Sequence, residues 1–358
     1  MNTLFFVASR LFASVVVMTI FLSFKQCQVV KAQVVSGTKD VMKGVERIGK
    51  IRYHYFDDST GSIVNTASRP CSDILMIGVG TAMKVQDYDN LAESIVTKAE
   101  TPSLVVVISD SNPGDINFIK KNSTKYANLA KGIRDQLNSG IIPVCTGQQD
   151  NLNFLIGGHS ASGQAALGAV QKGLYDFVPD GFVGLDPYEI DKRTMNFGSP
   201  LQLPTLSWGF DRTTCLVQVQ KAARGAYKLS SPDVGRVLYL IDNEHNSMTH
   251  CSFTDSGCGV GFVEVCPTNH KFEWVYESVA ESINLFVNTM KTDGASISKE
   301  NFELPSTVSG NASLFVNSDD VVMKGHSGVD GSKIMTSAVT TQSSITLLVM
   351  VVATVVFL

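Results

Sequence analysis

The sequence predicts an α/β protein built on a doubly wound, mostly parallel sheet with helices on both faces. Three observations favour this class. Short, continuously apolar runs rich in β-branched residues recur along the chain, as expected of strands in a parallel sheet that is covered on both faces. Gly, Asp and Pro bound these runs, and stretches with helical periodicity separate them. Such an alternation indicates an open sheet whose ligand site lies beyond the carboxyl ends of the strands.

The apolar runs are the predicted central strands, because each one is short and ends at a turn residue. In chain order they are Asp73–Gly80, Ser103–Asp110, Asn153–His159, Gly181–Asp186, Pro204–Asp211 and Arg236–Asp242. The stretches with helical periodicity are Tyr88–Ala99, Ser123–Leu137, Ala161–Lys172, Thr214–Tyr227 and Phe272–Met290. Val45–Thr66 alternates polar and apolar residues instead, so we expect an antiparallel edge hairpin there.

Both ends of the chain carry patterns typical of targeting signals. An uncharged apolar run follows Arg10, and Val30-Lys31-Ala32 suits a cleavage site, so residues 1–32 are predicted to be a secretory signal peptide. The alternative is an uncleaved anchor. Residues 344–358 form an apolar tail after Asp330-Gly331-Ser332 and a Ser/Thr-rich spacer, the pattern of a GPI-anchor signal, with a retained membrane anchor as the alternative.

These ends leave residues 33–291 as the predicted folded domain. Residues 292–343 are rich in Thr, Asp, Gly, Ser and Asn, so they are predicted to be a flexible stalk and spacer. The targeting signals predict an extracellular or cell-surface protein. The alternative is a plastid protein, for which the signal would be the first part of a two-step address. Asn122 and Asn311 would then be glycosylation acceptors.

Charge and cysteine content narrow the function classes. The formal net charge of −4 is spread without basic runs, which argues against a nucleic-acid partner. No C-x-x-C pair exists, so no structural zinc site is expected. After removal of the signal peptide, three disulfides are possible in an oxidising compartment among Cys71, Cys145, Cys215, Cys251, Cys258 and Cys266.

Residues 158–162 read GHSAS, close to the G-x-S-x-G pattern of a nucleophilic serine on a strand-to-helix turn. Ser160 directly follows a predicted strand and directly precedes a predicted helix. Residues two before and two after such a serine must be small; Gly158 meets this requirement, and Ser162 meets it approximately. Centring the turn on Ser162 would place Ser160 and the bulky Gln164 in the crowded positions, so Ser160 is the predicted nucleophile.

A nucleophilic serine requires a base, which follows it in this fold class. His250 is the predicted base, because it lies in the loop after the last central strand. His245, closer to that strand, is the reserve. The neighbouring Cys251 is expected to fix the loop through a disulfide, with Cys215 as a candidate partner and a second bridge between Cys258 and Cys266.

The base requires an orienting acid, and topology permits two. Asp186 ends one strand and precedes Pro187, which forces a turn there and presents the carboxylate at the edge of the sheet. Asp211 ends the next strand and precedes Arg212, with which it can pair. Asp186 is therefore favoured, and Asp211 is kept in reserve.

Two backbone N–H groups are candidates for stabilising an oxyanion. The helix after the nucleophile aims its first N–H groups toward it, which makes Ala161 one donor. The second is Thr81, in the loop after the first central strand, where Gly78 and Gly80 allow close approach of a substrate. An ordinary glycine turn is the alternative interpretation of that loop.

These motifs resemble those of a known group of enzymes. Residues 158–163 (GHSASG) resemble the G-H-S-R-G-G elbow of chlorophyllases, and residues 184–187 (GLDP) resemble the segment that carries their triad acid. Residues 250–255 (HCSFTD) are similar to the His-x-x-Phe-x-Asp stretch of platelet-activating-factor acetylhydrolases, where the His completes the triad. Both groups are α/β-hydrolases that cleave carboxylic esters, and the resemblance extends loosely over about residues 73–290.

The resemblance implies Ser160 as nucleophile, Asp186 as acid and His250 as base, without a cofactor or a metal. Two departures bear on the substrate: Ala161 and Ser162 stand where chlorophyllases have Arg and Gly, and no His precedes Gly80. We therefore expect a serine ester hydrolase that forms an acyl-enzyme and acts on a chlorophyll-type, phospholipid or short-chain ester. The alternative is an inactive hydrolase scaffold that serves in cell-surface adhesion.

Overall fold

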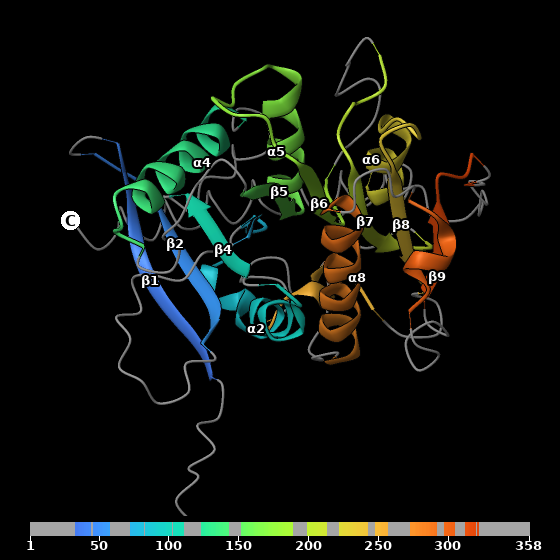
Figure 1. Ribbon diagram of the computed structural model, residues 1–358, viewed down its shortest axis with the longest axis horizontal. Coiled ribbons are helices and arrows are strands. Elements are labelled where there is room, and N and C mark those ends of the chain that lie inside the picture. Colours follow the sequence, from blue (N-terminus) through green and yellow to red (C-terminus); the bar gives the residue numbers. More distant parts are fainter. Residues whose placement is uncertain are drawn as a thin grey trace, which may run out of the picture.

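Nine strands form one mixed sheet in the order β1-β2-β4-β3-β5-β6-β7-β8-β9 (Figure 1). The computed structural model describes residues 33–43, 46–57, 72–81, 83–101, 103–110, 123–142, 152–188, 199–212, 222–242, 248–256, 273–291, 297–304, 312–319 and 321. The predicted signal peptide, the apolar tail, His245 and the two expected glycosylation acceptors, Asn122 and Asn311, lie outside these residues. No helix in the described ranges is long and apolar enough to cross a membrane.

The centre of the sheet is parallel, as predicted. Its strands pair in parallel from one neighbour to the next, and they are β3 (Asp73–Gly78), β4 (Ser103–Asp110), β5 (Asn153–His159), β6 (Gly181–Leu185), β7 (Thr205–Phe210) and β8 (Arg236–Ile241). These are the six apolar runs of the sequence. Because parallel strands end at one edge of the sheet, the loops after β3, β5 and β6 leave it side by side.

One edge of the sheet is an antiparallel hairpin, but it begins earlier than expected. It consists of β1 (Gln33–Lys43) and β2 (Glu46–Asp57), and β2 pairs antiparallel with β4. The expected hairpin over Val45–Thr66 is therefore wrong in its boundaries. Most of the described β1 side chains are exposed or half-buried, so no apolar run marks this edge strand in the sequence.

The opposite edge corrects the expectation of a flexible stalk from residue 292 onward. The short helix η6 (Lys299–Phe302) and β9 (Ala312–Val316) belong to the folded domain, where β9 pairs antiparallel with β8. Phe302 is fully buried and Leu304 nearly so. The other apolar residues of this stretch that pack on the core are Ile297, Ala312, Leu314, Phe315, Val316 and Val321. They are scattered among polar residues without a helical or strand-like period, which is why composition predicted a stalk.

Helices cover both faces of the sheet, as the sequence predicted. One face carries α2 (Asp89–Lys98) and α8 (Glu273–Lys291), and the other carries α4 (Ser123–Asn138), α5 (Ala161–Gln171) and α6 (Ala223–Leu229) (Figure 1). Alternate residues of β3 separate the two cores: Leu75 and Ile77 pack toward α2 and α8, whereas Ile74 and Met76 pack toward α4 and α5. The predicted helix from Thr214 is described only from residue 222 onward, and α6 begins at Ala223.

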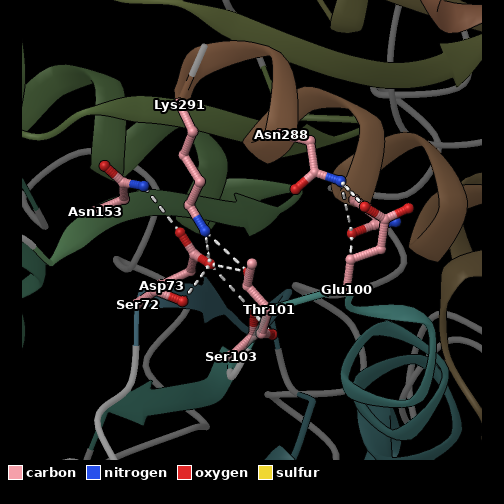
Figure 2. A network of polar contacts seen from close by, with 9 residues as sticks. Ser72, Asp73, Glu100, Thr101, Ser103, Asn153, Asn288 and Lys291 are labelled. Atoms are coloured by element: carbon pink, nitrogen blue, oxygen red, sulfur yellow. Dashed lines mark hydrogen bonds and ion pairs between the residues drawn. The ribbon is translucent and has the colours of Figure 1, made fainter.

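A buried carboxylate connects the amino ends of the central strands (Figure 2). Asp73, the first residue of β3, is 2% exposed. Its carboxylate accepts hydrogen bonds from Lys291 Nζ at 2.6 Å, Thr101 Oγ1 at 2.6 Å and Asn153 Nδ2 at 2.9 Å. Since Lys291 ends α8 and Asn153 begins β5, one side chain links a helix to two strands. This cluster lies at the end of the sheet opposite to the expected ligand site.

Candidate active site

Ser160 lies on a sharp turn between β5 and α5. Its backbone has φ 57° and ψ −126°, a sparsely populated conformation for a residue with a side chain, and one that costs about 1–3 kcal/mol. Two backbone hydrogen bonds hold the turn to the end of β6 and to the loop after it: Ser160 N donates to Leu185 O at 3.1 Å, and Tyr188 N donates to Ser160 O at 2.9 Å. The surrounding sheet therefore enforces the strained turn that the sequence indicated.

Two glycines make room for this turn. A Cβ atom on Gly158 would lie 2.8 Å from the Gly163 nitrogen, and a Cβ on Gly163 would lie 2.6 Å from the Pro187 Cβ. The residue after the nucleophile that must lack a side chain is therefore Gly163, three positions on, and not position 162. This role of Gly163 does not follow from the G-x-S-x-G spacing, which places the small residue two positions after the serine.

Ser162 instead links the turn to the loop after β3. Its hydroxyl is buried and donates a hydrogen bond to the Val79 carbonyl. The paired strands bring these segments together, since Gly78 and Gly158 are register partners in the β3–β5 ladder. The side chain thus holds the start of α5 against the loop that contains Thr81.

Asp186 and His250 form a buried pair at the same edge of the sheet. Asp186 directly follows β6 with φ 43°, and His250 is the first residue of the short helix η5 (His250–Phe253). Their contact joins His250 Nδ1 to Asp186 Oδ2 at 2.7 Å, and the two residues are 1% and 2% exposed. The structure therefore brings together the two residues that the sequence nominated as base and acid.

Burial favours the neutral imidazole of His250. It lowers the pKa of His250 to about 3, and it raises the pKa of Asp186 well above its usual value. The proposed base role requires Asp186 to be ionised; the carboxylate can then only accept, so Nδ1 of His250 carries the hydrogen of the pair and Nε2 keeps its lone pair. His250 can therefore receive a proton at Nε2.

The two candidate oxyanion donors lie on adjacent segments. Ala161 is the first residue of α5, and the first N–H groups of a helix have no partner within it. Thr81 follows β3, whose neighbour in the sheet is β5. A Cβ on Gly80 would lie 2.9 Å from His159 Nδ1, so glycine is required where this loop passes the turn. Both donors thus belong to segments held together beside Ser160.

An acidic residue missed by the sequence reasoning anchors the base loop. Asp255 Oδ2 accepts a hydrogen bond from Asn90 N at 3.0 Å, and Asp255 N donates to Asp87 O at 2.7 Å. A carboxylate at the amino terminus of α2 is favourably placed with respect to the helix dipole. Asp255 therefore fixes the loop that carries His250, and its place in the HCSFTD segment is the signal that marks it.

The reserve acid takes a different partner. Asp211 Oδ1 accepts a hydrogen bond from Arg224 Nη2 at 2.8 Å and is 46% exposed in its side chain. Asp211 thus contacts an arginine and not His250, and its expected pairing with Arg212 stays a prediction. Cys251, next to His250, is buried and disulfide-bonded; its partner lies outside the described residues, so the predicted pairing with Cys215 stays a prediction.

Within the described ranges, no group of three His, Cys, Asp or Glu side chains is arranged to hold a metal ion. The comparisons with known proteins give no match to a protein-family model and none to a curated protein. The chemistry of the site must therefore be inferred from its own geometry.

Proposed function

We propose that this protein is a serine-dependent carboxylic ester hydrolase with an α/β-hydrolase fold and the triad Ser160, Asp186 and His250. The observation that carries the proposal is the buried 2.7 Å contact between His250 Nδ1 and Asp186 Oδ2, beside a serine held with positive φ at the carboxyl edge of the sheet. Nucleophile, base and orienting acid are the set that acyl transfer requires.

In the proposed reaction, Ser160 Oγ attacks the ester carbonyl while His250 Nε2 takes the hydroxyl proton. The tetrahedral oxyanion is stabilised by the N–H groups of Ala161 and Thr81. Collapse of this intermediate breaks the bond to the leaving alkoxide, which takes the proton from His250. Water, deprotonated by His250, then attacks the acyl-enzyme and releases the carboxylic acid and free Ser160.

The environment of the site supports this cycle. During attack His250 becomes an imidazolium, and the adjacent Asp186 carboxylate compensates that charge in a region from which water is excluded. The amino terminus of α5 adds a partial positive charge where the oxyanion develops. Each charge that develops in the proposed reaction thus lies beside a group of opposite charge.

Labelling with a fluorophosphonate probe tests the nucleophile. We expect the wild-type protein to be labelled and Ser160→Ala to remain unlabelled. Ser162→Ala is the matched control, because it removes a buried hydroxyl from the same turn and should reach the same final extent of labelling as the wild type. If the wild type is labelled no more than Ser160→Ala, the proposal is wrong.

Turnover separates the enzyme from an inactive scaffold. We expect hydrolysis of p-nitrophenyl acetate by the wild type and loss of this activity in His250→Ala. Comparison of short-chain, long-chain and chlorophyll-type esters under the same conditions would then identify the preferred substrate class. Absence of both labelling and turnover would favour a scaffold for cell-surface interactions.

A further inference from the structure

Two buried side chains, Tyr88 and His159, connect the loop after β3 to the loop of His250. Tyr88 ends the short helix η2 (Val85–Tyr88), and His159 ends β5; both are completely buried. Gly80 N donates to Tyr88 Oη at 2.8 Å, and Tyr88 Oη lies 2.7 Å from His159 Nδ1. His159 Nε2 in turn lies 2.8 Å from the His250 carbonyl oxygen. A continuous chain of hydrogen bonds therefore joins Gly80 to His250.

The direction of each hydrogen bond follows from the acceptor at the far end. The carbonyl oxygen of His250 can only accept, so His159 Nε2 carries a hydrogen. In a neutral imidazole Nδ1 is then an acceptor, and Tyr88 must donate its single hydroxyl hydrogen to it. Met83 Sδ lies 3.0 Å from Tyr88 Oη. Because the hydroxyl hydrogen is donated to His159, the sulfur only packs against the hydroxyl oxygen. All three bonds are thus satisfied by one arrangement of hydrogens.

A neutral His159 also suits its position beside the proposed base. The rings of His159 and His250 lie with their centroids 4.5 Å apart and their planes tilted by 33°. Burial, with a smaller effect of His250, holds the pKa of His159 well below its usual value. When His250 accepts a proton in the reaction, its neighbour therefore adds no second positive charge.

We propose that Tyr88 and His159 are positioning residues that hold the oxyanion loop and the base loop in fixed relation to Ser160. This inference rests on the proposed function. The bond from Gly80 fixes the backbone directly before Thr81, and the bond to the His250 carbonyl fixes the backbone of the base itself. Hydrogen bonds thereby connect both loops to His159, the residue that immediately precedes the nucleophile.

The rate of fluorophosphonate labelling tests this role, since phosphonylation of Ser160 needs both the base and the oxyanion donors. Tyr88→Phe removes only the hydroxyl that links the two loops. We expect its labelling rate constant and its kcat for p-nitrophenyl acetate to fall roughly ten- to hundredfold, because small misplacements of reacting groups have effects of this size. The final extent of labelling and the KM should stay close to wild type.

Tyr239→Phe is the matched control. Tyr239 is equally buried, and its hydroxyl donates to the Phe302 carbonyl at 2.6 Å, away from the proposed site. Structural damage alone would lower the extent of labelling in both variants and leave the rate constant of the folded molecules unchanged. A rate constant for Tyr88→Phe within twofold of Tyr239→Phe would overturn the inference.

Variants of His159 provide a second test that does not depend on Tyr88. His159→Gln keeps one donor and one acceptor, whereas His159→Phe keeps a ring but supplies neither. We expect the labelling rate to decrease in the order wild type, Gln, Phe. Equal rates for the two variants would overturn the role of the hydrogen bonds. If the wild type itself is not labelled at Ser160, the proposed function fails. If the wild type is labelled and Tyr88→Phe is labelled at the same rate, only the positioning role fails.

Discussion

Replacement of Asp186 by asparagine isolates the contribution of the acid to the proposed reaction. The substitution keeps the size of the side chain and removes its charge. Since Asp186 is buried and its pKa is raised by burial, the fold should tolerate a neutral amide at this position. The free energy of unfolding is therefore expected to change little, and any loss of activity reports on chemistry.

The size of the loss follows from the geometry of the pair. The 2.7 Å contact between His250 Nδ1 and Asp186 Oδ2 places the centres of the two charges about 4 Å apart. At that separation an ion pair is worth about 4 kcal/mol with an effective dielectric constant of about 20. Loss of this stabilisation from the transition state lowers kcat roughly 10³-fold. If the amide also imposes the wrong tautomer on His250, the loss approaches about 10⁴-fold, as measured for such a change in a serine protease.

Steady-state hydrolysis of p-nitrophenyl acetate at pH 7 measures this effect, with unfolding by urea as a check on the fold. Asp211→Asn is the matched control, because Asp211 is the other strand-end aspartate and contacts Arg224 instead of His250. We expect the control to keep its kcat within about twofold of wild type. A tenfold or smaller loss in Asp186→Asn, or an equal loss in the control, would refute the assignment of the acid.

Three further predictions concern groups around the sheet. Lys291→Met should lower the free energy of unfolding by roughly 3 kcal/mol in a urea titration, because it leaves Asp73 buried without its charge partner. Lys98→Met, which removes an exposed ion pair, should cost less than about 1 kcal/mol, and equal costs would contradict the prediction. Burial lowers the pKa of His54 from 6.5 to about 4, so between these values only the unfolded chain binds the proton and stability falls as the pH falls. From pH 6.5 to 5 the wild type should lose about 2 kcal/mol more than His54→Gln; parallel losses would disprove this. Asp255→Ala should lower the kcat for p-nitrophenyl acetate about tenfold with little change in KM, because the base loop loses its anchor on α2. A raised KM with unchanged kcat would assign Asp255 to substrate binding instead.

The central sheet was predictable because strands buried on both faces must be apolar at every position. The edge strand β1 was not, because its exposed side chains are mostly polar, which explains the displaced hairpin. β9 (ASLFV) was missed for another reason: its short apolar run lies in a stretch rich in polar residues, and the composition of the whole stretch predicted a stalk. Sequence patterns thus report burial, and they identify an element only as far as burial determines its composition.

The candidate site shows the same limit. Ser160, Asp186 and His250 were nominated from their places at strand ends, which a parallel sheet brings to one edge. The contributions of Tyr88 and His159 depend on contacts between residues 71 positions apart, and no local pattern marks such a pair. Gly163 was overlooked for a different reason: the steric requirement is set by Pro187, which approaches from another loop.

The positive φ angles at Ser160 and Asp186 imply a trade-off between stability and activity. Of the three non-glycine residues with positive φ in the described part of the chain, two are the proposed nucleophile and acid. Glycine adopts this backbone region without the steric cost of a side chain, so replacing either residue by glycine relieves strain while removing a reacting group. A selection for thermal stability alone would therefore favour the loss of the site, and engineering of this protein has to score turnover together with melting temperature.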